Sequence, residues 1–349
     1  MQSTENFEWQ LRDLLGNGSF GYVYKGRSKT NTHTNVAIKS FRFTTKFYRN
    51  REANTLKRAN HVNVVKYIAM ENNLFTSEQH LIMEYCSEGD LQSFIESNQN
   101  GLSSSEFHQF FRNFLDGLKH LNENHIVHRD IKPSNILIDV NHGQRIYKLA
   151  DFGAARILKP NERYGSLYGT AEYLHPDIFE HMYRTYDGRP TKQDFGELHE
   201  LWSIGVTLYE TVTGLLPFNP KDGRKNPKML YKMTKEKERG QISAIETQNG
   251  NIEWSSKLPD TCALNEPLKK KITTLLAGLI ESDEENMWSK AKLFFEADKR
   301  LPPLRRTFNK SGISRREARK KLSKSTHLYR REKSKYKRFQ REFSLVPEN

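Results

Sequence analysis

The segment His128-Arg129-Asp130-Ile131-Lys132-Pro133-Ser134-Asn135, with Asp151-Phe152-Gly153 16 residues further on, is the most informative part of this 349-residue sequence. Phosphoryl transfer needs an oriented hydroxyl, a metal ion on the phosphates and positive charge on the transferred group. Asp130 can accept a hydroxyl proton, and Lys132 can reach a phosphate. Asn135 and Asp151 offer the hard oxygen ligands that Mg²⁺ prefers. The two segments together therefore predict a phosphoryl-transfer site.

Two segments upstream of these motifs suit phosphate binding. The glycine-rich turn at 16–23, Gly-Asn-Gly-Ser-Phe-Gly-Tyr-Val, lets backbone approach phosphates without Cβ clashes, although an ordinary hairpin turn is the alternative. A strand pattern follows the turn, which differs from the helix of a dinucleotide-binding fingerprint. Lys39 ends the apolar strand Val36-Ala37-Ile38, where a solvated lysine is the ordinary alternative. An ion pair with Glu52, 13 residues on, would aim the ammonium at phosphate oxygens.

The hydrophobic pattern changes period along the chain. Short β-type segments at 8–40 predict an antiparallel meander, and the runs at 64–70 and 80–86 predict further strands. One helix is predicted at 46–60. The prediction for the first part of the chain is thus a small, mainly β lobe.

Helical patterns dominate after Gly89. Apolar residues at 105–124 recur on one helix face, and Ser103 with Glu106 is a possible capping box. Further helices are predicted at 198–213, before Gly214, and at 268–280. The predicted fold class is therefore α+β, with a small antiparallel β-sheet lobe that carries one helix and a larger, mainly helical lobe.

Composition excludes several classes of protein. The sequence is 36% hydrophobic, which is enough for a core, and no apolar run reaches the length of a membrane-spanning helix. The N-terminus lacks the basic flank and apolar run of a secretory signal. Two cysteines, Cys86 and Cys262, are too few for a disulfide framework or a cysteine zinc site. We therefore expect a cytoplasmic location, with nuclear access through the basic tail as an open alternative.

The net charge of +14 is concentrated at the C-terminus. Residues 301–349 carry a net charge of +12, whereas residues 1–300 carry +2. A solvated arm, disordered or partly helical, is one interpretation of this tail. A nuclear-import or nucleic-acid patch with Tyr329, Tyr336 and Phe339, and an arm for anionic lipid or acidic partners, are the others.

These motifs, in this order, resemble those of eukaryotic protein kinases over about residues 7–300. The resemblance implies a two-lobed kinase fold, with an N-lobe at about 7–85, a hinge at 84–89 and a C-lobe at about 90–300. The segment Ile131-Lys132-Pro133-Ser134-Asn135 is similar to the serine/threonine branch. Tyrosine kinases usually carry Ala-Ala-Arg or Arg-Ala-Ala there.

The resemblance also implies roles for individual residues. Asp130 is the expected catalytic base, Lys132 contacts the γ-phosphate, and Lys39 holds the α- and β-phosphates while it pairs with Glu52. Asn135 and Asp151 hold Mg²⁺. The expected ATP-binding residues come from the glycine-rich turn, the strands of the N-lobe, the hinge and the pocket floor: Leu15, Gly16, Asn17, Gly18, Ser19, Phe20, Gly21, Val23, Ala37, Lys39, Met83, Glu84, Cys86 and Leu137.

A closer resemblance appears downstream, in Gly165-Ser-Leu-Tyr-Gly-Thr-Ala-Glu-Tyr-Leu-His-Pro-Asp-Ile-Phe-Glu180. This stretch is similar to the IκB-kinase-related kinases, the TANK-binding kinase and IKK-epsilon group. Ser166 then matches the activation-loop phosphorylation site, with Arg129 as its expected partner, although an unmodified turn residue is the alternative. Phosphate adds about −1.5 to −2 charges. Thr170 is assigned to the substrate loop.

Two features depart from that family. Glu200 stands where the family has an aspartate that braces the catalytic loop, and the extra methylene is expected to weaken the brace. The relatives continue into ubiquitin-like and coiled-coil regions that this sequence does not show, so a short isoform, a fragment and a divergent member all remain open. Adaptor docking and oligomeric state, which depend on those regions, stay undetermined.

The resulting hypothesis is an ATP- and Mg²⁺-dependent protein kinase that phosphorylates Ser or Thr of protein substrates in innate immune and inflammatory signalling. One alternative is a pseudokinase, or regulatory ATP-binding module, with little turnover. A second alternative makes nucleic-acid binding by the tail the main activity.

Overall fold

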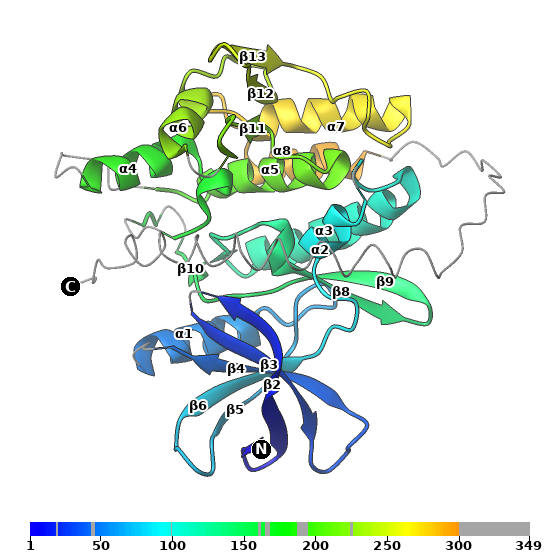
Figure 1. Ribbon diagram of the computed structural model, residues 1–349, viewed down its shortest axis with the longest axis vertical. Helices are drawn as coiled ribbons and strands as arrows, with labels where there is room; N and C mark the ends of the chain where they lie inside the picture. The colour runs from blue at the N-terminus through cyan, green and yellow to red at the C-terminus, as the bar shows by residue number, and fades with distance from the viewer. Residues whose placement is uncertain are drawn as a thin grey trace. The chain divides into compact units, whose positions relative to one another are not determined.

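The computed structural model describes residues 1–18, 20–42, 46–98, 100–159, 162–164, 168–186, 195–223 and 226–299, which belong to one compact unit. Ser19, Ser166 and the basic tail lie outside these residues, and so do the side chains of residues 182, 183, 185 and 186. In the described residues, two lobes follow one another along the chain (Figure 1). The predicted two-lobed α+β fold is confirmed.

The N-lobe is an antiparallel sheet with strand order β1-β2-β3-β4-β6-β5 and one helix against it. Its elements have these bounds: β1 Gln2–Ser3, β2 Phe7–Gly18, β3 Gly21–Ser28, β4 Asn35–Phe41, α1 Lys46–Arg58, β5 Tyr67–Asn72 and β6 Gln79–Glu84. The meander and the helix that the sequence predicted are therefore present.

Both faces of the central strand β4 are covered. Val36 and Ile38 belong to a core cluster with Trp9 on one face, and side chains of a strand alternate between faces. Ala37 and Lys39 therefore share the opposite face, where Lys39 is paired in register with Leu81 of β6. This alternation directs Lys39 away from solvent, so the solvated-edge interpretation of this lysine is wrong.

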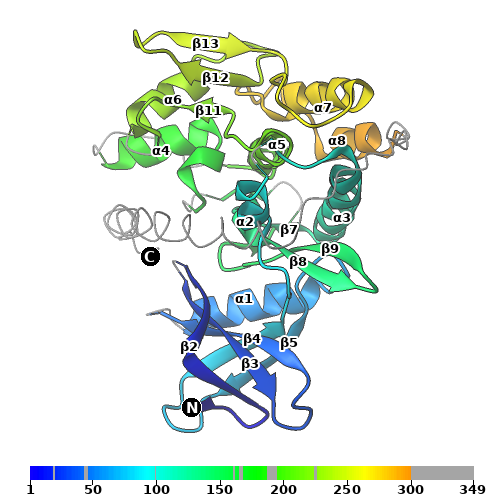
Figure 2. The same ribbon diagram turned by 45° about the vertical axis from the view of Figure 1, so that its right-hand side comes forward.

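The C-lobe is mainly helical, with short sheets at its edges. Its first part contains α2 Leu91–Glu96, α3 Ser104–Glu123, β7 Ile126–Val127, the 3-10 helix η1 Pro133–Asn135, β8 Ile136–Asn141, β9 Gln144–Leu149 and β10 Arg156–Ile157. Its second part contains η2 Ala171–Tyr173, α4 Pro176–Tyr186, α5 His199–Thr213, β11 Phe218–Asn219, α6 Pro227–Lys235, β12 Ser243–Glu246, β13 Ile252–Ser255, α7 Glu266–Leu279 and α8 Lys290–Asp298. The β8–β9 hairpin lies between the N-lobe and helices α2 and α3 in both views (Figures 1 and 2).

Helix α5 forms the centre of the C-lobe. All of its residues are buried, which is typical of a helix that other elements surround. Gly214 ends it in the left-handed conformation, with its amide donating to the Glu210 carbonyl at 2.8 Å. Helix α3 packs its predicted apolar face inward, and Ser103 caps it as expected. The carboxylate of Glu106, however, bonds the Ser103 hydroxyl instead of completing the capping box.

Gly101 connects the α2–α3 segment to the end of α5, and we expect Gly101→Ala to destabilise the protein. Its φ is +74°, and a Cβ would lie 2.3 Å from the carbonyl carbon of Val212. Left-handed strain and overpacking together should lower the free energy of unfolding by about 2 kcal/mol or more. Urea denaturation measures this change.

Gly196→Ala is the matched control, since nothing lies within 4 Å of its Cβ position and its φ is not positive. An equal loss of stability in both variants would contradict the argument from Gly101.

Candidate active site

The predicted catalytic loop, residues 128–135, follows the short strand β7 and is held by helix α5. Arg129 has a φ of +66°, which is unusual for a residue with a side chain. One carboxylate oxygen of Glu200, Oε2, accepts hydrogen bonds from the amides of His128 at 2.5 Å and Arg129 at 2.9 Å. The longer side chain of Glu200 thus makes both bonds of the brace, and the expected weakening stays a prediction.

Asp130 lies at the centre of a polar network. Its Oδ2 accepts from Lys132 Nζ at 2.7 Å and from Asn135 Nδ2 at 2.9 Å. Thr170 joins the network, because its hydroxyl donates to Asp130 Oδ1 at 3.0 Å and accepts from Lys132 at 2.6 Å. The structure therefore brings Asp130, Lys132 and Asn135 together with Thr170, which the sequence assigned to the substrate loop; their roles stay predictions.

Lys39 lies between two carboxylates that come from different elements. Its Nζ is 2.5 Å from Glu52 Oε1 of α1 and 2.8 Å from Asp151 Oδ1 of the segment after β9. Burial alone would lower the pKa of Lys39, but the charges of Asp151 and Glu52 raise it. The ammonium is therefore charged at neutral pH, and the predicted Lys39–Glu52 pair is present.

The two carboxylates respond differently to Lys39. Burial works against ionisation of Asp151, yet the charge of Lys39 lowers its pKa to about 2. At Glu52, burial raises the pKa although Lys39 opposes the shift. Because the ammonium is only 2.5 Å from Glu52, we treat the contact as an ion pair.

The glycine-rich segment covers this charged group. Gly16, Gly18 and Gly21 are in the paired ends of β2 and β3, and Asn17 accepts from Arg42 Nη2 at 2.9 Å. A Cβ at Gly21 would lie 2.2 Å from the Ser40 carbonyl oxygen, so the approach of β3 to β4 requires glycine there. Ser19 was also predicted to bind ATP and lies outside the described residues.

A ring contact positions Phe20 and a register shift positions Leu15, and the sequence predicted neither feature. The Phe20 ring lies against Gly153, where a Cβ would be 2.7 Å from it, and 5.5 Å from Lys39 Nζ. Leu15 falls at a register shift between Leu14 and Gly16 and is about half exposed. Phe20 therefore lies over the charged group, whereas Leu15 faces solvent.

An apolar pocket floor lies next to the hinge. Val65, Cys86 and Ala150 form a small buried cluster against which Met83 and Leu137 pack. Ala37 is paired with Met83 in register, and Val23 is paired with Lys39. Burial raises the pKa of the Cys86 thiol to about 12, so this cysteine is a packing residue at neutral pH. Glu84 forms an ion pair with Lys148 at 2.8 Å.

A group of arginines lies beside the catalytic loop. The Arg129 guanidinium donates to the Ala154 carbonyl at 2.6 Å and stacks over the rings of Tyr164 and Tyr168. Burial, together with the charges of Arg156 and Arg51, lowers the pKa of Arg129 to about 10. Arg51 and Arg156 had no assigned role in the sequence, and Ser166 lies outside the described residues.

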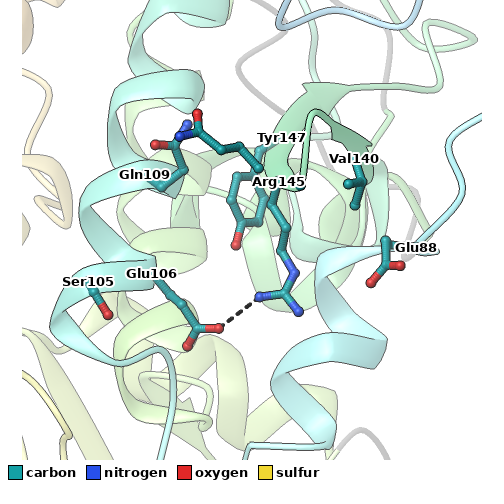
Figure 3. A pocket seen from close by; sticks show the side chains of 9 residues that line it. Glu88, Ser105, Glu106, Gln109, Val140, Arg145 and Tyr147 are labelled. Atoms are coloured by element: carbon teal, nitrogen blue, oxygen red, sulfur yellow. Dashed lines mark hydrogen bonds and ion pairs between the residues drawn. The ribbon is translucent and has the colours of Figure 1, made fainter.

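Two other features lie outside the cleft. A hollow between α3 and the β8–β9 hairpin contains the Glu106–Arg145 ion pair and Tyr147, but none of the predicted catalytic residues (Figure 3). His175, Asp177 and His199 place their possible ligand atoms within 4.8 Å of one another. Backbone groups already engage both ring nitrogens of His175, so we interpret these residues as packing between α4 and α5.

Comparisons with known proteins agree with this geometry. The model of the protein kinase domain matches residues 9–297. The chain is 46% identical over 307 residues to the mouse inhibitor of nuclear factor kappa-B kinase subunit epsilon, which covers 85% of this chain and 42% of that protein. It is 32% identical over 286 residues to the alpha subunit of the same kinase from Xenopus laevis, and 31% identical over 286 residues to the alpha subunit from Gallus gallus. Each of these matches covers 79% of this chain and 36% of the relative. The chain thus spans less than half the length of these relatives.

The Lys39 ammonium is expected to stabilise the fold as well as the site. Lys39→Met leaves the buried Glu52 carboxylate without its cation and should lower the free energy of unfolding by about 3–5 kcal/mol. Thermal or urea unfolding at pH 7 measures this change. Lys25→Met is the control, because Lys25 lies on the neighbouring strand, where its ammonium is placed over the Tyr85 ring. Equal stability of the Lys39 variant and the control would show that the pair does not stabilise the fold.

Proposed function

The chain belongs to the protein kinase family, with a catalytic domain related to the IκB kinases, and on this premise we propose that it transfers the γ-phosphoryl group of ATP to Ser or Thr hydroxyls of proteins. The observation that carries the proposal is the proximity of Asp130, Asn135 and Asp151: Asn135 bonds Asp130, its carbonyl accepts from the amide of Ala150 at 2.8 Å, and the next residue, Asp151, pairs with Lys39. The domain proposed to do this chemistry is residues 7–300.

Asp130 is the proposed acceptor of the substrate hydroxyl proton. Lys132 and Asn135 donate to its Oδ2 and Thr170 donates to its Oδ1, so its orientation is fixed before a substrate arrives. A carboxylate held in this way can align a hydroxyl with the phosphate, which is the main requirement of phosphoryl transfer. Lys132 is also the proposed contact to the γ-phosphate.

ATP is proposed to bind under the glycine-rich segment. Nothing lies within 4 Å of the Cβ positions of Gly16 and Gly18, which leaves room for phosphates, and Lys39 offers a buried ammonium that Glu52 orients. The adenine is proposed to occupy the apolar floor, between Val23 and Ala37 on one side and Leu137 on the other, with hinge backbone at Glu84 and Cys86.

The site also fits Mg²⁺, which the protein kinase family generally uses together with ATP. Asn135 donates its amide hydrogens to Asp130, which leaves its carboxamide oxygen as a ligand, and Asp151 supplies an ionised carboxylate. Both are hard oxygen donors, which suit this ion. When bound, Mg²⁺ neutralises charge that develops on the phosphate oxygens.

The alternative of a pseudokinase is not favoured. Every position that the chemistry requires is filled by the expected residue type, and the Glu200 brace is intact. The proposal of nucleic-acid binding by the tail concerns residues outside the described part of the chain. Among the described residues, no helix has the length and apolar character to cross a membrane. A role in innate immune signalling in the cytoplasm, with adaptor proteins as partners, is proposed from the relatives.

Asp130→Ala should reduce phosphate transfer from radiolabelled ATP to a protein substrate by at least about 100-fold, because the hydroxyl loses its proton acceptor. Asp139→Ala is the control, since Asp139 lies on β8 and bonds the exposed Ser87. Equal incorporation of phosphate by wild-type protein and the Asp130 variant would refute the enzyme hypothesis.

We propose further that phosphate on Ser166 activates the kinase. The Arg129 guanidinium lies among the charges of Arg51 and Arg156, which line a hollow between α1 and β10 together with one carboxylate, Glu162. Several positive charges at close range favour the binding of an added anion, and a phosphate brings about −1.5 to −2 charges. Ser166 is near this cluster in sequence, two residues before Tyr168, whose ring Arg129 contacts.

Arg156→Gln should reduce the activation that phosphorylation produces by about 10-fold, because one charge-assisted hydrogen bond to phosphate is lost. Activity is compared before and after phosphatase treatment, and mass spectrometry records the occupancy of Ser166. Arg145→Gln, which removes a cation beside Glu106 on the C-lobe surface, is the control. If the Arg156 variant is activated as strongly as the control, the arginine cluster does not bind the phosphate on Ser166.

A further inference from the structure

Lys290 is a buried cation in an unfavourable position. It is the first residue of α8 and only 7% exposed. Burial disfavours an ammonium, and the N-terminal end of a helix dipole carries partial positive charge that repels it. A nearby negative charge must therefore offset both the cost of burying the ammonium and its repulsion by the helix dipole.

Glu200 supplies the compensating charge. Lys290 Nζ lies 3.3 Å from Glu200 Oε1 and 3.6 Å from Oε2 of Glu197. The Glu197 side chain is more than half exposed, whereas the Glu200 side chain is 2% exposed. Because solvent screens the exposed pair, the buried contact to Glu200 is the stronger of the two.

The two oxygens of Glu200 have different partners. Oε1 faces Lys290, and Oε2 accepts from the amides of His128 and Arg129. A buried carboxylate without a cation is unstable in its charged form and tends to become neutral or to turn toward other donors. The ammonium therefore keeps Glu200 oriented for the two amides.

Those amides belong to a strained part of the backbone. Arg129 has a φ of +66°, a strained conformation that persists only where the surroundings hold it. The next residue is Asp130, and its direction depends on the peptide that precedes it. A shift of the Arg129 amide would therefore also move Asp130, the proposed proton acceptor.

We propose that Lys290 is a positioning residue for phosphoryl transfer, which acts on Asp130 through Glu200 and the amides of His128 and Arg129. This inference rests on the proposed kinase function. Lys290 touches neither substrate nor nucleotide in this scheme, so its loss should affect turnover more than nucleotide binding.

The test is a double-mutant cycle on the full chain with Lys290→Met, Glu200→Gln and the double variant. We expect Lys290→Met to lower kcat at least about 10-fold with little change in the KM for ATP. The double variant should be no worse than Glu200→Gln alone, because both changes act on one pathway. Lys290→Arg, which keeps the charge, should restore most of the turnover.

Lys237→Met is the matched control, since Lys237 is a buried lysine 3.9 Å from Glu281 and does not contact the catalytic loop. It should lower the melting temperature but leave kcat unchanged. Lys290→Gln replaces Lys290→Met in the cycle if the methionine variant does not fold. Wild-type kcat in the folded Lys290 variant, additive losses in the double variant, or an equal loss of kcat in the Lys237 control would each overturn the inference.

Amide hydrogen exchange separates this inference from the proposed function. Faster exchange at His128 and Arg129 in the Lys290→Met protein than in the Lys237 control supports the positioning contact, whether or not the chain turns over ATP. Wild-type activity no greater than that of Asp130→Ala would instead count against the kinase function. Unchanged exchange at both amides would overturn the positioning role.

Discussion

The ammonium of Lys39, held between Glu52 and Asp151, is the contact on which the rest of the site depends. It joins three elements: β4, α1 and the segment after β9. A buried lysine is stable only if carboxylates meet it, so the position of α1 and the conformation at Asp151 are both coupled to it. The lobes therefore meet through charge at this point, although apolar packing supplies most of their separate stability.

The catalytic loop in the C-lobe is likewise held by a buried ion pair. There a buried carboxylate, Glu200, is surrounded by the amides of the loop and by the ammonium of Lys290. Its neighbour Tyr164 is affected as well, because burial and the charge of Glu200 both raise the pKa of that hydroxyl. In both places an ion pair in the interior costs desolvation energy and fixes the direction of a functional group, which an apolar contact of the same size would not do.

The sequence predicts the local features well, because each depends on neighbours in the chain. The strand of Lys39, the helix of Glu52 and the spacing from Asp130 to Asn135 follow from periodicity and motif. The pair of Glu200 and Lys290 does not, since it joins residues 90 positions apart through the packing of α8. One signal was present: Lys290 shares a helix face with the buried Leu293 and Ala297, where a lysine needs a partner. The bulge at Leu15 and the ring contacts of Arg129 had no comparable signal.

Two residues with side chains, Arg129 and Asp151, adopt positive φ values of 66° and 60° at the cleft. Each is bonded to a buried side chain, Glu200 for the first and Lys39 for the second. Because the pKa of Asp151 is about 2, its carboxylate is ionised at neutral pH while it bonds Lys39. Nucleotide phosphates carry more negative charge than one carboxylate and would compete for the same ammonium. The lysine thus keeps Asp151 ionised and oriented in the free protein; in the proposed nucleotide complex it would turn to phosphate, which would leave the carboxylate for a metal ion.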